Sequence, residues 1–578
     1  MTQNQSKQKL TVWNSIIILL SIIGLVVCIA FLFPKIRWMV IDWAVQNFRN
    51  GVSVDQVWID SLLSFAMGGI FLILFFNYCT LTNSGRTLVA KVKQEIIDCL
   101  SEIDFHSLLK PVLIMFGVYL LGILSIIRAD FSYMDDLARA VVGFQRWFSN
   151  SRYLEYAATF VHGDFHLTDI SPVPQLLAVL IMSIGSVFLV YVIGNKKITV
   201  VRLLASIPLG LFPYFLECLT FKIDAPYMAL SVLASVVPFL FVARKKAFFF
   251  ISVVSLLVML MTYQSASGIY LLIVIVLSFQ NWNSRRQSNK EILSFLWIAV
   301  LAFCFALLFY KYCLMIPFGH LEMYPVSQLI SGALINIKNY IITINHDLGI
   351  IWKAGIVLVL LFFITKSMAQ SSRNKIVSLC VSILTVSVLF IFSFGIFLVL
   401  TEPSYNPRSI FGFGVFLAII CVYVVSDIKK PAIVVVLALN WCLFTFAFSY
   451  GNALADQKRY ADFRISLLLH DLSVLYPNRN VDEMIIHLNN SIDFAPTIRN
   501  ISKNNPVIER LVPKRLGTKP GIIWDDYYYR VYFNYYTLNK SWDNYLFDLN
   551  ALDLPVVLDS YYHTIQSDGE HVLVTLKR

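Results

Sequence analysis

The chain has 578 residues, of which 58% are hydrophobic and only 14% are charged, and its formal net charge is +11 at pH 7. A soluble protein of this size would carry far more charge, so the composition indicates a polytopic helical membrane protein. The basic residues fall mostly in short segments between apolar runs, which the positive-inside rule explains better than nucleic-acid binding does.

The apolar runs predict about thirteen membrane helices of roughly 20 residues each. The first two lie near residues 15–34 and 59–79, and the aromatic segment between them, residues 36–48, is typical of a helix in the membrane interface. A third span near residues 109–127 leads into a polar stretch, residues 128–174. The remaining ten are predicted near residues 175–194, 200–215, 227–242, 248–263, 268–280, 293–316, 348–364, 376–400, 410–425 and 432–450.

Loops on one side of these spans all carry clusters of lysine or arginine, whereas loops on the other side are mixed or acidic and several of them are long. Because basic loops stay in the cytoplasm, the N-terminus is expected inside, and residues 128–174 and the C-terminal segment outside. The basic clusters are Arg86, Lys91 and Lys93; Lys196 and Lys197; Arg244, Lys245 and Lys246; Arg285, Arg286 and Lys290; Arg373 and Lys375; and Lys429 and Lys430.

Three regions follow from this pattern: an N-terminal region with two membrane helices (residues 1–108), a transmembrane core that includes the polar stretch (residues 109–450) and a small α/β domain outside the membrane (residues 451–578). The last region has no membrane-length apolar run and is rich in Tyr, Asn and Asp. Its predicted elements are a helix over residues 460–476, a strand over residues 484–488, and a hairpin of residues 554–565 and 571–578. None of the nine cysteines has metal-binding spacing, so we expect buried apolar side chains rather than disulfides.

The polar stretch contains the candidate catalytic residues, Asp135 and Asp136, followed by Arg139. On a helix, Arg139 shares a face with acids three and four positions before it. One carboxylate would take a proton from an attacking hydroxyl, while the other acid or the arginine fixes the geometry or meets a phosphate. The alternative is a solvated first turn whose acids match the helix dipole. We favour catalysis because the pair directly follows a membrane span on the outer face.

Cations on the same face are candidates for binding a phosphate, because phosphate needs fixed donors and arginine provides a bidentate fork. The alternative for each cation is contact with lipid headgroups. The outer-face cations are Arg139, Arg146, Arg152, Lys222 and Arg408, and of these we predict donor-phosphate contacts for Arg139, Arg152, Arg408 and Lys222.

Other polar residues of the outer loops have weaker patterns. His162, Asp164, His166 and Asp169 are suitable ligand types for a metal, but they form no metal motif, and we predict no metal and no cofactor. Asp169 is alternatively expected to cap the next helix. Gln264 lies in a polar turn that either satisfies its own backbone or contacts sugar hydroxyls. The predicted substrate contacts are Trp147, Asp169, Asp224 and Gln264.

Several of these motifs together resemble the Gtr type-II glucosyltransferases, the serotype-converting enzymes that decorate bacterial O-antigen. The resemblance covers about residues 109–454 and departs from the family pattern at Ser151, where the family prefers glycine. The motifs that carry it are Asp135-Asp136-x-x-Arg139, Gly143, Trp147, Arg152, Asp169-Ile170-Ser171-Pro172-x-Pro174-Gln175, residues 213–231, the YQSASG turn, the turn with Arg408, and Tyr450-Gly451-Asn452-Ala453-Leu454.

The resemblance implies a GT-C-like all-α polytopic membrane bundle in the bacterial inner membrane, with the C-terminus in the periplasm. Such an enzyme moves a sugar, typically glucose, from polyprenyl phosphate to a hydroxyl of lipid-linked O-antigen, which is part of lipopolysaccharide. Asp135 or Asp136 would be the base, with Arg139 and Arg152 near the phosphate. No nucleotide enters the reaction, which agrees with the lack of a glycine-rich phosphate loop.

Two kinds of alternative remain from the sequence. The first is another lipid-linked-sugar transferase, acting on lipid A or on protein. The second is a polysaccharide flippase or polymerase. A transporter should carry charges along a path within its spans, whereas the predicted spans of this chain hold few charges, so we favour the transferase. The expected partners are the polyprenyl-phosphate sugar, the lipid-linked glycan and membrane lipids, and no nucleic acid.

Overall fold

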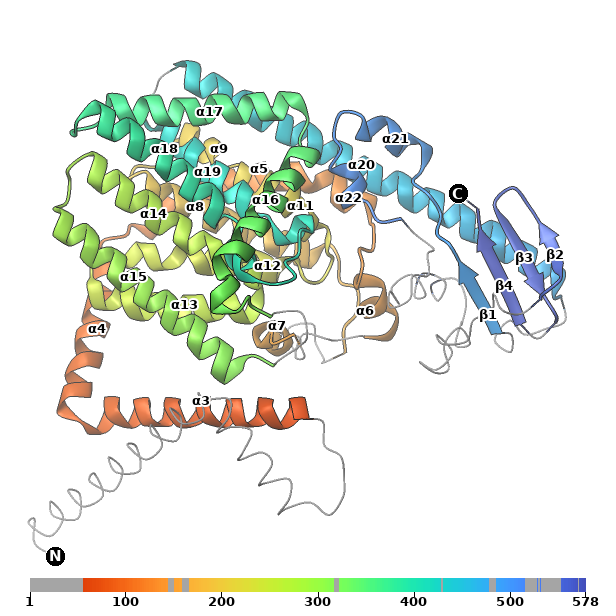
Figure 1. The fold of residues 1–578 in the computed structure, drawn as a ribbon, viewed down its shortest axis with the longest axis horizontal. Coiled ribbons are helices and arrows are strands. Elements are labelled where there is room, and N and C mark those ends of the chain that lie inside the picture. The colour runs from red at the N-terminus through yellow and green to blue at the C-terminus, as the bar shows by residue number, and fades with distance from the viewer. Residues whose placement is uncertain are drawn as a thin grey trace, which may run out of the picture.

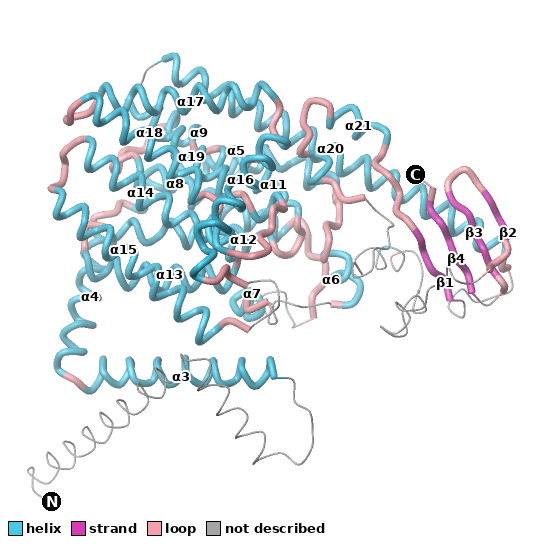
Figure 2. The backbone as a smooth tube through the Cα atoms, viewed as in Figure 1, coloured by secondary structure: helices cyan, strands magenta, loops and turns pink. Residues whose placement is uncertain are grey.

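The computed structural model describes residues 56–143, 150–158, 166–316, 322–427, 430–477, 485–514, 528, 531, 553–569 and 571–577. In these residues a large bundle of helices is followed by a small sheet at one end (Figures 1 and 2). This arrangement confirms the predicted class, a polytopic helical bundle with a small C-terminal α/β domain. The predicted first span and the interfacial segment over residues 36–48 lie outside the described residues.

The bundle is built from the following helices, in chain order: α3 (Gln56–Leu81), α4 (Asn83–Ser101), α5 (Phe105–Ala129), α6 (Asp136–Val142), α7 (Tyr153–Ala158), α8 (Val173–Ile193), α9 (Val200–Ala205), α10 (Pro208–Leu211), α11 (Pro213–Thr220), α12 (Ala225–Val236), η2 (Val237–Phe241), α13 (Lys245–Thr262), η3 (Gln264–Ala266), α14 (Ser267–Asn283), α15 (Asn289–Phe309), η4 (Tyr310–Leu314), η5 (Val326–Gln328), α16 (Leu329–Asp347), α17 (Ile350–Ala369), α18 (Lys375–Phe392), η6 (Gly395–Val399), η7 (Pro407–Ser409), α19 (Gly412–Val424), η8 (Val425–Asp427) and α20 (Lys430–Leu475).

The described chain contains nine helices that are long and apolar enough to cross a membrane, and one broken span made of Val200–Leu211 and Pro213–Thr220. Two shorter apolar helices, Ala225–Phe241 and Gly412–Val424, occupy the other predicted spans. Each span predicted beyond residue 56 therefore corresponds to an apolar helix, and the polar turn divides α13 from α14 as expected.

The span predicted over residues 200–215 differs in shape from the expectation. It bends by 64° before Pro213 and continues to Thr220. Proline has no backbone N–H and its ring clashes with the preceding helical turn, so α11 leaves the direction of α9 and α10. The bend brings the segment after Pro213 to the end of the bundle where the polar stretch lies.

Helix α16 lies in one of the long loops between predicted spans, where no helix was predicted. Its buried residues recur at helical spacing and include Asn336, Tyr340 and Asp347, whereas Ile330 and Ile341 are exposed. The amide of Asn336 donates to the carbonyl oxygens of residues 397, 398 and 400 at 3.2, 3.2 and 2.9 Å. The helix is therefore amphipathic, and the hydrogen bonds of Asn336 fix its buried face to η6.

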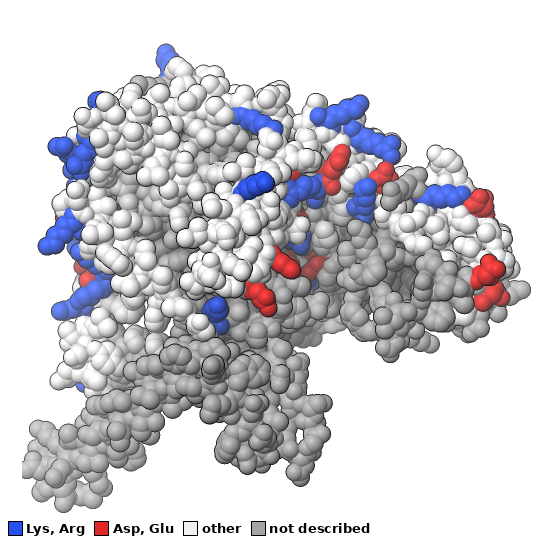
Figure 3. Space-filling model, in the orientation of Figure 1, with Lys and Arg blue, Asp and Glu red and all other residues white. Residues whose placement is uncertain are grey.

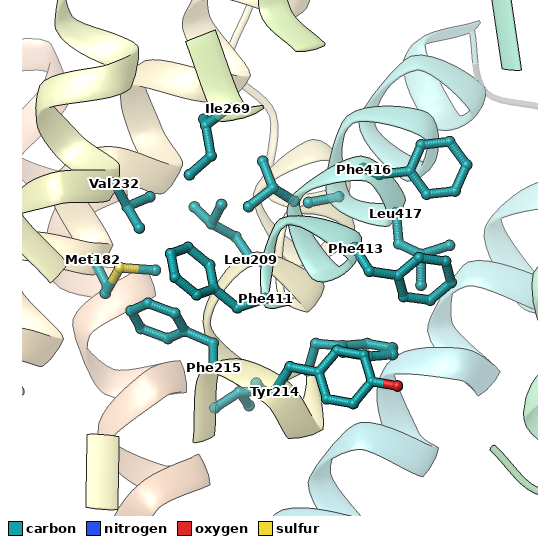
Figure 4. Packing of buried hydrophobic residues seen from close by; sticks show 14 of the residues in the cluster. Met182, Leu209, Tyr214, Phe215, Val232, Ile269, Phe411, Phe413, Phe416 and Leu417 are labelled. Carbon is teal, nitrogen blue, oxygen red and sulfur yellow. The ribbon is translucent and has the colours of Figure 1, made fainter. Parts of the chain in front are cut away.

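Helix packing in the bundle uses close backbone approach and interhelical hydrogen bonds, which matter in lipid because apolar surface gains little by leaving it. Gly451 of α20 lies so close to α5 that a Cβ there would be 2.4 Å from Ser125 Oγ. Ser125 Oγ donates to the carbonyl of Ala447 at 3.0 Å. In the interior of the bundle, buried aromatic side chains such as Phe215, Phe411 and Phe413 pack together (Figure 4).

Helix α20 carries the chain from the bundle to the C-terminal domain. Its 46 residues span about 69 Å at 1.5 Å per residue, more than twice the roughly 30 Å of a bilayer core. The predicted span over residues 432–450 and the predicted helix over residues 460–476 are thus parts of one helix. Leu137 of α6 packs with Ile465 and Leu468 on its second half, so α6 lies where the bundle meets the domain.

The C-terminal sheet has the strand order β1-β4-β3-β2, with β1 parallel to β4 and the other pairs antiparallel. The strand predicted over residues 484–488 is confirmed as β1, and the predicted hairpin is confirmed as β3 and β4. The first arm of that hairpin is itself folded into β2 and β3. The elements beyond α20 are β1 (Ile485–Asn489), α21 (Pro496–Ser502), α22 (Ile508–Leu511), β2 (Val556–Asp559), β3 (His563–Ser567) and β4 (His571–Leu576).

The basic loops lie together at one end of the bundle. Figure 3 shows Lys and Arg side chains along the left edge, over the ends of α14, α15, α17 and α18. Glu102 in the turn before α5 pairs with Lys196 at 3.1 Å and with Arg244 at 3.9 Å. These ion pairs bring the loops before α5, after α8 and before α13 together at the same end. Since consecutive spans alternate in direction, the polar stretch and the other non-basic loops lie at the opposite end.

Candidate active site

Five segments far apart in the sequence meet at the end of the bundle opposite the basic loops. They come from the end of α5 through α6, the start of α7, α11 with the turn after it, the turn between α13 and α14, and the turn before α19. In residue numbers they are 130–139, 151–155, 217–224, 263–264 and 405–409.

Asp136 is the buried member of the acid pair. Its side chain is 2% exposed, and Oδ2 accepts the backbone N–H groups of Tyr133 and Lys222, both at 3.0 Å. Burial raises the pKa of Asp136 to about 7, although the two N–H donors and Arg139 act in the opposite direction. The carboxylate therefore ties the turn before α6 to the segment after α11.

Asp135 precedes α6 and is 31% exposed at its side chain, with Oδ2 3.4 Å from Nη2 of Arg139. Burial raises the pKa of Asp135, against the lowering effect of Arg139 and, more weakly, of Arg408 and Arg152. The buried Arg139 also donates to Asp224. Asp135 is thus a part-exposed carboxyl group that stays protonated up to a higher pH than an ordinary aspartate.

Lys222 is buried between two carboxylates, those of Asp130 and Asp169. Its Nζ donates to Asp130 Oδ1 and lies 3.0 Å from Asp169 Oδ2. The other oxygen of Asp169 accepts the N–H of Ser171 at 2.8 Å. Helix α8 begins at Val173 without a side-chain cap, so the expectation that Asp169 caps it was wrong: its carboxylate is held by Lys222 and by its own turn.

Arg408 is held by a buried acid that the sequence analysis did not single out, Glu217 of α11. Nη1 of Arg408 donates to Oε1 at 3.0 Å, and its backbone N–H donates to Oε2 at 2.6 Å. The hydroxyl of Tyr133 donates to Oε1 at 3.0 Å. The signal in the sequence was a single acid inside an apolar run, and an ionisable residue at such a place is a candidate functional residue.

Arg152 lies across Tyr263 from Arg408, within the cluster of charged residues formed by the five segments. Its guanidinium carbon is 4.8 Å from the centre of the Tyr263 ring, and Nη1 is 3.5 Å from Oε2 of Glu155. Burial raises the pKa of Glu155 to about 8, against the effect of Arg152. Glu155 was also missed by the sequence analysis, where its position three residues after Arg152 was the available signal. Nε2 of Gln264 donates to the hydroxyl of Tyr310 at 2.8 Å.

These contacts link the predicted site residues into one region. Tyr263 connects its two sides, because its ring lies under Arg152 and its hydroxyl donates to the carbonyl of Arg408 at 3.2 Å. Trp147, Arg146, His162 and Asp164 lie outside the described residues. The predicted site residues that the structure brings to this end are Asp135, Asp136, Arg139, Arg152, Asp169, Lys222, Asp224, Gln264 and Arg408.

The described part of the chain holds no group of three His, Cys, Asp or Glu residues suited to a metal ion. A cavity of about 450 Å³ exists at the basic end of the bundle, lined by residues such as Glu102, Lys196 and Phe239, and it shares no residue with the cluster. The cluster also combines the part-exposed carboxylate of Asp135 with two part-exposed arginines whose charges act on it, since Arg408 is 29% and Arg152 18% exposed at their side chains.

Comparison with known proteins identifies the family of the chain. Neither the curated proteins nor the solved structures contain a match to the chain. The family model described as Glucosyl transferase GtrII matches residues 124–425, more than half of the chain, from the end of α5 to the end of α19. The match includes Asp135, Glu217 and Arg408 and identifies a membrane glucosyltransferase. The chain belongs to the GtrII glucosyltransferase family.

Proposed function

We propose that the protein transfers a sugar, glucose by its family, from polyprenyl phosphate to a hydroxyl of a lipid-linked O-antigen glycan. The reaction takes place at the periplasmic face of the bacterial inner membrane, in a GT-C-like core over residues 109–450. The C-terminal domain, residues 451–578, is periplasmic too. The orientation is supported by the basic loops, which belong in the cytoplasm, because the site lies at the other end.

The observation that carries the proposal is the position of Asp135. Of the acids at this end, Asp136, Glu155, Glu217 and Asp224 are buried, and the exposed Asp130 and the part-exposed Asp169 are held by Lys222. Asp135 presents a part-exposed carboxylate 3.4 Å from Arg139. A positioned carboxylate accelerates attack by a hydroxyl roughly a hundredfold to ten-thousandfold. The raised pKa of Asp135 makes its carboxylate a better proton acceptor.

The proposed step is a substitution at the anomeric carbon. The acceptor oxygen forms the new bond to that carbon, its proton passes to Asp135, and the bond from the carbon to the phosphate oxygen breaks. The electron pair leaves with polyprenyl phosphate, whose additional negative charge needs fixed cations.

Arg408 and Arg152 are the best placed of the four predicted cations for that charge, because they are more exposed than Arg139 and Lys222. Arg139 and Lys222 are each already paired with two carboxylates. We therefore assign the phosphate to Arg408 and Arg152. Arg139 fixes Asp135 and Asp224, and Lys222 fixes Asp130 and Asp169, so we assign these two cations and the acids Asp136, Asp169 and Asp224 to holding the site together. We keep Gln264 and Trp147 as sugar contacts.

The test is a transfer assay with membranes that contain the protein, a lipid-linked O-antigen acceptor, and glucose labelled on either polyprenyl phosphate or a nucleotide. We expect the label to reach the glycan from polyprenyl phosphate in membranes that cannot make that donor from the nucleotide sugar. Transfer from the nucleotide sugar in such membranes, or none from polyprenyl phosphate, would show the proposal to be wrong. Lipid A and protein acceptors in parallel reactions test the alternative acceptors.

A further inference from the structure

The short helix α22, which lies far beyond the matched family region, reaches into the candidate site. Its Arg510 donates to the carboxylate of Asp347 and to the carbonyl oxygen of Tyr405. The next carbonyl oxygen, that of Leu511, lies 2.9 Å from the hydroxyl of Tyr133, which shares its one proton between this oxygen and Oε1 of Glu217. Residues of the C-terminal segment thus contact two of the segments that form the site.

The contact with Asp347 is a strong constraint. Asp347 is the last residue of α16, where the helix dipole disfavours a negative charge, and its side chain is fully buried. A buried carboxylate needs close partners, and here Arg510 and the hydroxyl of Tyr214, at 2.8 Å from Oδ2, supply them. The position of Arg510 is therefore fixed by the bundle.

From this fixed position Arg510 reaches the turn that carries Arg408. Tyr405, whose carbonyl it binds, lies three residues before Arg408. The backbone N–H of Arg408 is meanwhile held by Glu217, and the hydroxyl of Tyr133 lies between Glu217 and the Leu511 carbonyl of α22, sharing its proton between the two oxygens. Two routes therefore run from α22 to Arg408, one through the backbone of the turn and one through Tyr133 and Glu217.

We propose that Arg510 is a positioning residue that holds the turn of residues 405–409 so that Arg408 can bind the phosphate of the donor. The inference rests on the proposed function of Arg408 and gives the segment after α20 a part in donor binding. A guanidinium is suited to this task because its planar fork reaches two acceptors at once, which an ammonium at the same place holds less well.

The first test does not depend on activity. In purified full-length protein, hydrogen exchange is followed in peptides that cover residues 401–411, where the N–H groups of Arg408, Ser409 and Ile410 are hydrogen-bonded. We expect exchange to be about tenfold faster in Arg510→Ala and intermediate in Arg510→Lys. The control is Arg499→Ala, which removes a 70% exposed arginine from the same segment. Unchanged exchange in Arg510→Ala overturns the proposal.

The second test asks whether Arg510 acts through Arg408. The KM for the polyprenyl-phosphate sugar should rise about tenfold in Arg510→Ala, while the KM for the glycan stays the same. The double variant Arg408→Ala/Arg510→Ala should lose no more kcat/KM than Arg408→Ala alone, because residues that act as a unit are not additive. Effects that multiply, or an unchanged donor KM, overturn the proposal.

The two tests also separate this inference from the proposed function. If the unaltered protein transfers no sugar from polyprenyl phosphate, the proposed function fails, and the exchange measurement alone decides whether Arg510 holds the turn. If Arg510→Ala does not fold, Asp347→Asn takes its place: it keeps the shape of the side chain and removes the charge that fixes Arg510, and the same faster exchange over residues 401–411 is expected.

Discussion

Replacing Asp135 and Asp136 separately by asparagine is the sharpest test of the site, because the two acids are adjacent in the sequence and differ in environment. Asp135 is 31% exposed at its side chain, whereas Asp136 is 2% exposed. Asp135→Asn removes the proposed base and should lower transfer by roughly a hundredfold to ten-thousandfold. That loss corresponds to about 3–5 kcal/mol at 1.36 kcal/mol per factor of ten.

Asp136→Asn should behave differently. The asparagine oxygen can accept the same two N–H groups that Oδ2 accepts, and its amide group would occupy the place of Oδ1, which has no hydrogen-bond partner among the described residues. We expect transfer within a few-fold of normal. Asp136→Ala, by contrast, leaves two buried N–H groups unpaired at about 1–3 kcal/mol each, so its yield and thermal midpoint should fall.

The dependence on pH gives a second measurement for each acid. The pKa of Asp136 is raised to about 7 in the folded protein, above its unfolded value near 3.9. Its ionisation therefore costs stability progressively as the pH rises through that window. The thermal midpoint of Asp136→Asn relative to the unaltered protein should increase between pH 5 and pH 8.

For Asp135 the measurement is the pH dependence of transfer. The loss of activity at low pH, which comes from protonation of the proposed base, should disappear in the activity that Asp135→Asn retains.

The assay is sugar transfer in membranes with protein levels matched by immunoblot, and Asp135→Glu serves as a variant that keeps a carboxylate. An inactive but well-folded Asp136→Asn together with an active Asp135→Asn would refute the reasoning, because it would assign the base to the buried acid. Normal turnover in both variants would remove α6 from the catalytic centre. Asp130, Asp169 and Asp224 would then be the next acids to test.

Three further outcomes are expected. Arg408→Lys keeps the charge but loses the fork, and the KM for the donor should rise about tenfold, or about 1.4 kcal/mol; an unchanged KM would exclude Arg408 from phosphate binding. The pKa of Glu155, raised to about 8, keeps this acid protonated below that pH, so transfer should decline above pH 8 as the carboxylate competes for Arg152, and Glu155→Gln should remove the decline. A reporter that is active only in the cytoplasm, fused after Arg578, should be silent, and an active fusion would reverse the orientation.

Hydropathy and charge, which are local properties of the chain, determined the architecture. A run of apolar residues long enough to cross a bilayer predicts a span wherever it occurs, so α13 and α14 were predicted as separate spans by the polar turn between them. Clusters of basic residues likewise predicted which loops share one end of the bundle. Hydropathy did not predict α16, because polar and apolar residues are interspersed along that amphipathic helix. It also did not predict the bend at Pro213, because the apolar run continues through the proline.

The sequence also predicted a carboxylate pair near arginines, since Asp135, Asp136 and Arg139 are close in the chain. It left open which acid is accessible, because that depends on the segment that covers each one. The segment that carries Lys222, more than 80 residues later, covers Asp136 and donates a backbone N–H to its carboxylate, whereas Asp135 stays part-exposed. Glu217 and Arg510 entered the site in the same way, because only the packing of α11 and α22 against the bundle brings their charges to Arg408 and its turn.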